Sequence, residues 1–206
     1  SNVHAGVDVF LKNNHNTPGT GIQAIIPNYT TQNFAAWMHH KLTLKKFELD
    51  AGWRYEFQQY NVSTFNNLNQ LIFPKKTYNT FAISATLFYK INQILDWTSG
   101  LTLSNRAPNI NELFSQGVHQ SAAAIEYGDE LMKPERSFKW TNKFELKWNE
   151  KAHLSITPYL HVINGFIYLN PQKEYEITIR GAFPVFQYEQ LSLVNIGGID
   201  ADITFY

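Results

Sequence analysis

Residues that could bind a metal ion or another ligand are concentrated near the middle of the chain, between Asn105 and Glu135. This stretch holds His119, Glu126 and Asp129, and an imidazole with carboxylates is a donor set that suits transition metals. The stretch is rich in Pro, Gly, Asn and Gln, which indicates a long loop, and binding function concentrates in loops. We therefore predict these three residues as ligand-binding candidates, with His119 as the candidate metal ligand. The alternative is that they only help to fold the loop.

Patterns of catalytic residues do not stand out. The seven His residues are scattered, and no His-x-x-Glu-His, Gly-x-Ser-x-Gly or phosphate-binding Gly loop occurs. The chain has no Cys, which excludes a disulfide framework and a thiolate metal site. On a strand, the adjacent His39 and His40 would point to opposite faces and could not chelate one ion. A glycosidase would need two carboxylates at a defined separation, and no such pair is evident. We expect neither an enzyme nor a cofactor.

Composition limits the class of protein. With 206 residues the chain could form one ordinary domain, and its 17 basic and 17 acidic residues cancel, which argues against a nucleic-acid partner. Aromatic residues make up 15% of the chain, a share expected where Tyr, Trp and Phe form the girdles of a membrane barrel. No run approaches the roughly eighteen apolar residues of a membrane helix, whereas a barrel strand needs only roughly 9–11 alternating residues.

Alternation with a period of two residues dominates the chain. From Phe47 to Gln58, every odd position is apolar or aromatic, and every even position is charged, polar or Gly. Successive side chains of a strand point to opposite faces, so this segment predicts a strand with one apolar face and one polar face. A helix would need apolar residues three to four positions apart. Similar alternation predicts about eight strands, at residues 3–11, 29–44, 47–57, 81–91, 95–103, 138–148, 154–169 and 191–205.

The connections between these strands alternate between short and long. Short turns are predicted at Lys45, Asn92 and Glu150, and long loops at residues 12–28, 61–78, 105–137 and 170–184. This asymmetry is typical of outer-membrane barrels, in which tight turns face the periplasm and large loops face the exterior. No long helix, linker or short internal repeat is predicted.

A soluble sandwich or barrel with a dry core would explain the alternation equally well. Two features favour a membrane barrel. Bulky aromatic residues such as Trp53 and Trp148 lie toward strand ends, as interfacial belts require, and the opposite faces carry charges such as Arg54 and Lys143, which suit a water-filled lumen. A soluble all-β ligand-binding module, such as a lectin-like sandwich, and a passive porin are the alternative interpretations.

Two segments of the central stretch carry a series of motifs, "NRAPNINELFSQGVH" from Asn105 and "EYGDELMKPERS" from Glu126. In order they contain Arg-x-Pro, Glu-Leu-Phe, Gly-x-His, Glu-x-Gly and Leu-x-x-Pro-Glu-x-Ser, the last of which precedes a strand. This series resembles the barrel of TonB-dependent outer-membrane receptors. Weaker similarity covers most of the chain, in "IPNY" at 26–29, "AGWRYEF" at 51–57 and "FPVFQYEQ…GGIDADITF" near the end.

The resemblance implies an all-β fold, an antiparallel transmembrane β-barrel of which residues 1–206 are a part. Transporters of this kind have about 22 strands, whereas eight strands close a barrel too narrow for a solute path. About eight strands would therefore be a partial barrel, with the family's N-terminal plug and the remaining strands outside this sequence. Open strand edges are a liability, so we expect the isolated fragment to self-associate through them.

The same resemblance suggests roles for individual residues. Arg106, Glu112 and Glu135 match motif positions and are expected to hold the barrel architecture, since Arg pairs bidentately with carboxylates. In the family, acidic residues of the inner wall contact arginines of the plug, and Asp200 is the candidate here. A second acid usually follows six positions after the Pro-Glu acid, and this sequence has Thr141 at that place.

By resemblance, the intact protein would lie in the lipid of the bacterial outer membrane and bind a scarce solute, such as a ferric siderophore, haem, cobalamin or a metal ion. It would import the solute with energy from the TonB–ExbB–ExbD complex, reached through the plug, and would perform no bond chemistry. The segment "FIYLNP…RGAFPVFQYEQ" is similar to a subgroup with zinc- and haem-linked members, which favours a metal or a metal chelate as the solute.

Overall fold

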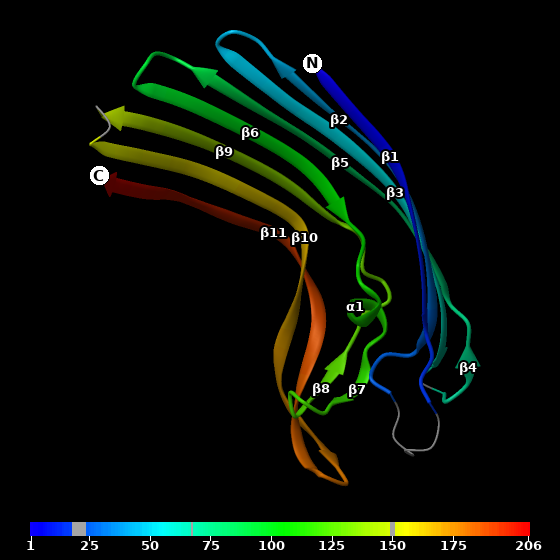
Figure 1. Ribbon diagram of the computed structural model, residues 1–206. Helices are drawn as coiled ribbons and strands as arrows, with labels where there is room; N and C mark the ends of the chain where they lie inside the picture. Colours follow the sequence, from blue (N-terminus) through cyan, green and yellow to red (C-terminus); the bar gives the residue numbers. More distant parts are fainter. Residues whose placement is uncertain (18–23, 67, 149–150) are drawn as a thin grey trace.

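The computed structural model describes residues 1–17, 24–66, 68–148 and 151–206, and most of these residues lie in one curved sheet (Figure 1). Eight long strands follow one another across the sheet in sequence order, each antiparallel to its neighbours. They are β1 (Asn2–Asn14), β2 (Asn28–Thr43), β3 (Phe47–Phe65), β5 (Lys75–Lys90), β6 (Leu95–Arg106), β9 (Glu135–Trp148), β10 (Ala152–Thr178) and β11 (Gly181–Phe205).

The predicted all-β, antiparallel, partial barrel is confirmed, and the eight predicted strands correspond to these eight long strands. The sheet is open, with β1 at one edge and the C-terminal half of β11 at the other (Figure 1). The predicted turns at Lys45 and Asn92 lie between consecutive strands. The predicted turn at Glu150 lies outside the described residues, as does the centre of the predicted loop 12–28.

The pairing register separates an outer face from an inner face along every long strand. Cα partners on neighbouring strands share a face, and on β9 the outer face carries Trp140 and Phe144, which are 43% and 41% exposed. On the inner face of β3, the guanidinium of Arg54 contacts Asp8 and Glu56. A soluble sandwich would bury its aromatic face in a dry core. The exposed aromatic rows instead suit a wall that meets lipid outside and water inside.

The predicted loop at 170–184 is wrong, because β10 and β11 continue through it as a paired hairpin that ends at Thr178 and Gly181. The ladder shifts register between Pro171 and Tyr175 and then resumes. Both faces of this hairpin are largely exposed near its tip. The alternation that marks a half-buried strand is therefore lost there, and the sequence pattern no longer distinguishes strand from loop.

The other long loops are shorter or more ordered than predicted. β3 extends to Phe65, a two-residue strand β4 (Leu71–Ile72) pairs with it, and β5 begins at Lys75, so the predicted loop 61–78 shrinks at both ends. The connection between β6 and β9, residues 107–134, is called the central loop below. It contains α1 (Ile110–Phe114), β7 (Gln116–His119) and β8 (Ala124–Tyr127), none of which was predicted. Among the described residues, no helix has the length and apolar character needed to span a membrane.

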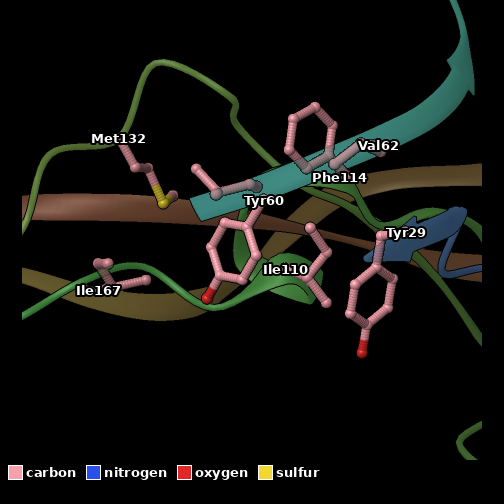
Figure 2. Packing of buried hydrophobic residues seen from close by; sticks show 8 residues of the cluster. Tyr29, Tyr60, Val62, Ile110, Phe114, Met132 and Ile167 are labelled. Atoms are coloured by element: carbon pink, nitrogen blue, oxygen red, sulfur yellow. The ribbon is translucent and has the colours of Figure 1, made fainter. Parts of the chain in front are cut away.

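A hydrophobic core lies between the central loop and the inner face of the wall (Figure 2). Its buried members are Tyr29, Tyr60, Val62, Ile110, Leu113, Phe114, Met132 and Ile167. They come from β2, β3 and β10 on the wall side and from α1 and the residues after β8 on the loop side. Full burial of one large apolar side chain contributes about 1.5–3 kcal/mol. The loop is therefore a packed part of the fold rather than a solvated connection.

Candidate functional site at the anchored central loop

One guanidinium holds both ends of the central loop to the wall. Arg106 ends β6, and its Cα partner across the sheet is Glu135, the first residue of β9. Its Nε lies 2.6 Å from Glu135 Oε2, and one terminal nitrogen lies 2.9 and 3.1 Å from the two carboxylate oxygens of Glu112 in α1. The Glu112 and Glu135 side chains are only 11% and 12% exposed. Charge-assisted hydrogen bonds of this kind are the strong class.

Glu112 also fixes the start of α1. Its Oε2 accepts a hydrogen bond from the backbone N–H of Asn109 at 2.7 Å, the reciprocal half of a capping box. Pro108, just before this cap, is fully buried, and its carbonyl accepts a hydrogen bond from the Tyr60 hydroxyl at 3.2 Å. The Arg-x-Pro and Glu-Leu-Phe motifs thus encode one short helix that is capped, charged and packed against the wall.

Glu135 has a second role at the point where β10 leaves β9. The β9–β10 ladder ends at the pair Arg136–Asn164, and the free Glu135 oxygen accepts the backbone N–H of Ile167 at 2.6 Å. Between these positions Gly165 adopts a φ of 69°, which L side chains rarely adopt. The Glu135 carboxylate therefore binds Arg106, which in turn holds Glu112 of the central loop. It also binds the backbone of Ile167 at the base of the β10–β11 hairpin.

Gln190 is a contact residue that the sequence did not single out. Its Oε1 accepts the Lys133 N–H at 3.0 Å, and its Nε2 donates to the carbonyls of Lys133 and Gly165 at 2.7 and 2.9 Å. A Cβ on Gly165 would lie 3.3 Å from this amide nitrogen. Alternation predicts only that Gln190 is polar and faces inward, so no sequence signal distinguishes it from other wall residues.

Gly128 of the Glu-x-Gly motif permits a close backbone approach to α1. A Cβ at this position would lie 2.5 Å from the Leu113 carbonyl carbon. Here the Gly128 N–H donates to the Ser115 carbonyl at 2.7 Å and the Asp129 N–H donates to the Glu112 carbonyl at 2.9 Å. These bonds join the end of β8 to the end of the helix.

The structure brings together two of the three predicted ligand-binding residues. His119 Nδ1 lies 2.6 Å from Glu126 Oε1, with the imidazole half exposed and the carboxylate buried. Asp129 instead accepts the Leu131 backbone N–H at 2.8 Å, as a turn residue does. Across the described ranges, no three His, Asp or Glu side chains gather as a metal ion requires. The ligand-binding role of these residues and the metal role of His119 stay predictions.

A further contact ties the central loop to the hairpin. The Tyr127 hydroxyl at the end of β8 donates to the Glu176 carboxylate of β10, with distances of 2.8 and 2.9 Å to its two oxygens. Burial, together with this carboxylate, raises the pKa of Tyr127 to about 12. β8 also pairs in parallel with residues 185–187 of β11. The central loop and the hairpin are thus joined both by this side-chain contact and by backbone pairing.

The predicted plug-contact residue lies apart from this site. Asp200 is an exposed residue of β11, and its Cα partner is Thr157 of β10. Among the described residues its side chain forms no hydrogen bond or ion pair. Thr141, at the place of the missing second acid, lies on β9 and pairs with Tyr159 of β10. Asp200 is therefore available on the inner face for a partner, and its role stays a prediction.

The docked loop leaves a hollow that a ligand could enter. A cavity of about 370 Å³ lies between the β3–β4 turn and the loop, lined by apolar residues such as Phe65 and Leu113 and by the buried Ser115. Within the described part of the chain, Ser115 Oγ has no hydrogen-bond partner. The described residues that line this cavity provide an apolar binding surface and one buried hydroxyl group.

Comparison with known proteins identifies the architecture. The family described as TonB dependent receptor-like, beta-barrel matches residues 2–206. Copper transporter OprC has a similar structure, with TM-score 0.65 and 15% identity over 86% of this chain and 27% of its own. The Serratia marcescens hemophore receptor HasR, solved with its hemophore HasA and heme, has a TM-score of 0.64 and 13% identity, over 98% of this chain and 36% of HasR. The FrpB iron transporter of Neisseria meningitidis has a TM-score of 0.54 and 11% identity, over 88% of this chain and 24% of FrpB.

This chain therefore spans about a third or less of the length of these structures. No protein of curated function matches the sequence. The likeness to the solved structures concerns the fold, whereas the family match covers nearly every residue. The chain belongs to the TonB-dependent receptor β-barrel family, and it is part of a barrel of the bacterial outer membrane.

Proposed function

We propose that this chain forms part of an active transporter that imports a scarce solute, namely a ferric siderophore, haem, or a metal ion or chelate, with energy derived from TonB. The observation that carries the proposal is the family match over residues 2–206. Three structural neighbours, a copper transporter, a hemophore receptor with heme and an iron transporter, support a metal-containing solute. Members of this family are transporters rather than enzymes.

The anchored central loop supports an active rather than a passive role. It packs on the inner face of the wall and is held there by Arg106 and by the core around Tyr60 and Val62. A loop fixed inside the wall narrows the passage and presents its residues to an entering solute. We propose solute contact at His119, whose half-exposed imidazole is paired with the buried carboxylate of Glu126, with Asp129 nearby in sequence.

The coupling to energy would run through the parts of the receptor outside this chain. We propose that Asp200 contacts an arginine of the plug, and that the plug reaches the TonB–ExbB–ExbD complex. The support is that Asp200 is exposed on the inner face and that, within the described residues, its side chain forms no hydrogen bond or ion pair. A carboxylate of this kind gains a bidentate partner when an arginine docks against it.

Growth on defined solutes tests the proposal. The intact receptor is expressed in a bacterium that lacks its own metal-chelate receptors, and growth is measured with ferric siderophore, haem, copper or zinc as the limiting nutrient. We expect rescue with one of these solutes, and loss of rescue when tonB is deleted. His119→Ala should weaken rescue, whereas His15→Ala, which removes an exposed His from another loop, should not. Rescue that persists without tonB would refute the active mechanism in favour of a passive porin.

A further inference from the structure

Three polar residues lie side by side on the outer face, at the end of the wall next to the central loop. Asn105 of β6, Arg136 of β9 and Asn164 of β10 are successive Cα partners. Residues paired in this way share a face, with Cβ atoms about 4.5–5.5 Å apart. They alternate along their strands with Arg106 and Glu135, which face inward. Their side chains therefore leave the outer face as one row.

Arg136 is an exposed cation of this row. Over residues 1–17, 24–66, 68–148 and 151–206, its guanidinium forms no ion pair or hydrogen bond. The adjacent acid, Glu135, points to the opposite face and is occupied by Arg106. An unpaired arginine on a lipid-facing wall costs up to about 2–4 kcal/mol at mid-membrane and little near the interface. At the long-loop end of the wall, its guanidinium can reach an anion at the membrane surface.

Apolar rows follow this polar row on the same three strands, toward the short-turn end of the wall. The first row is Leu103, Phe138 and Val162, and the second is Leu101, Trp140 and Leu160. Leu103, Trp140 and Leu160 are exposed. At the opposite end of the same strands, the outer row is Leu95, Leu146 and Leu154, without a cation or an amide. The three-strand surface is thus amphiphilic, with its polar row only at the long-loop end.

We propose that this surface binds a phosphorylated, acylated glycolipid of the outer leaflet. The guanidinium of Arg136 matches a phosphate bidentately. The amides of Asn105 and Asn164 each offer donors and an acceptor, which suits sugar hydroxyls, and the acyl chains lie along Phe138 and Trp140. None of the nine residues in the polar row and the two apolar rows that follow it is acidic, so the surface does not repel the phosphate. The proposal does not depend on which solute the receptor carries.

Lipid titration of the intact receptor tests this proposal. Purified receptor is titrated with lipid A, dephosphorylated lipid A or phosphatidylglycerol, and the bound lipid is counted by native mass spectrometry. Arg136→Gln should weaken lipid A binding about ten- to hundredfold, the range for one charged hydrogen-bond partner. The matched control is Lys139→Gln, which removes a cation from the inner face of the same strand and should leave binding unchanged. Arg136→Lys should retain part of the binding.

Each result decides the proposal. Selective loss with Arg136→Gln and weaker binding of dephosphorylated lipid A support it. Equal binding of phosphatidylglycerol and lipid A would overturn the sugar contact, and unchanged binding in Arg136→Gln would overturn the site. If Arg136→Gln fails to fold, the double substitution Asn105→Ala and Asn164→Ala serves instead, since it keeps the cation. That double variant should lose the preference for lipid A over phosphatidylglycerol, and a preserved preference would also overturn the proposal.

Discussion

Replacing Arg106 by Ala should release the central loop while leaving the barrel wall folded. The substitution removes three charge-assisted hydrogen bonds of 2.6–3.1 Å and leaves two carboxylates that are only 11% and 12% exposed. Breaking a buried pair in this way costs about 3–5 kcal/mol. Because the Arg106 side chain is itself 41% exposed, water screens part of the interaction. We therefore expect the lower end, about 3 kcal/mol of loop-docking free energy.

Hydrogen exchange of the intact receptor measures this loss directly. A loss of about 3 kcal/mol corresponds to a roughly hundredfold faster exchange, and the faster amides should be those of residues 107–134, with β3 and β6 unchanged. Arg54→Ala is the matched control, because Arg54 has the same 41% exposure and also binds two carboxylates, on a part of the wall away from the loop. Unchanged loop exchange in Arg106→Ala, or equal acceleration in Arg54→Ala, would refute the reasoning.

Three further substitutions test other contacts. Gly128→Ala places a methyl group 2.5 Å from the backbone of α1 and should undock β8 and lower the thermal unfolding temperature, whereas Gly197→Ala, whose nearest neighbour would be 3.5 Å away, should have little effect. Because the folded-state pKa of Tyr127 is raised to about 12 from 10.0, its bond to Glu176 stabilises fully below pH 10 and is lost between pH 10 and 12. The protection of the β8 amides, measured relative to their hydroxide-catalysed intrinsic exchange rates, should fall in that pH range, and Tyr127→Phe should abolish this fall. Asp200→Ala should increase exchange in the plug and slow uptake, and unchanged values of both would disprove the plug contact.

The strands could be predicted because a wall between lipid and water imposes one simple pattern. Phe47 to Gln58 alternates without a break, since every second side chain meets a different solvent. Beyond this segment the rule changes. Tyr60 and Val62 are apolar yet face inward, because they pack against α1 rather than against water. A single-strand pattern cannot reveal this, since the partner lies about fifty residues away in the sequence.

Motifs revealed the charged anchor but not the contacts around it. Arg106, Glu112 and Glu135 stood out because their spacing resembles a known family, and the structure joins all three. Gln190 contributes three hydrogen bonds through an ordinary polar side chain, so its importance depends on where Gly165 and Lys133 lie in space. Backbone acceptors leave no trace in the sequence, and contacts to them become evident only when the chain is folded.

The sharing of Glu135 has a consequence for motion in the receptor. Its two oxygens bind Arg106, which holds the central loop, and the Ile167 N–H, which holds the base of the hairpin. If the loop moved alone, Arg106 of β6 would stay beside Glu135 of β9, but Tyr127 would have to leave Glu176 and β8 would have to leave β11. Both losses are avoided when loop and hairpin move together, with Gly165 and its positive φ at the base of the hairpin. A solute that shifts the central loop should therefore shift the hairpin with it, as one body.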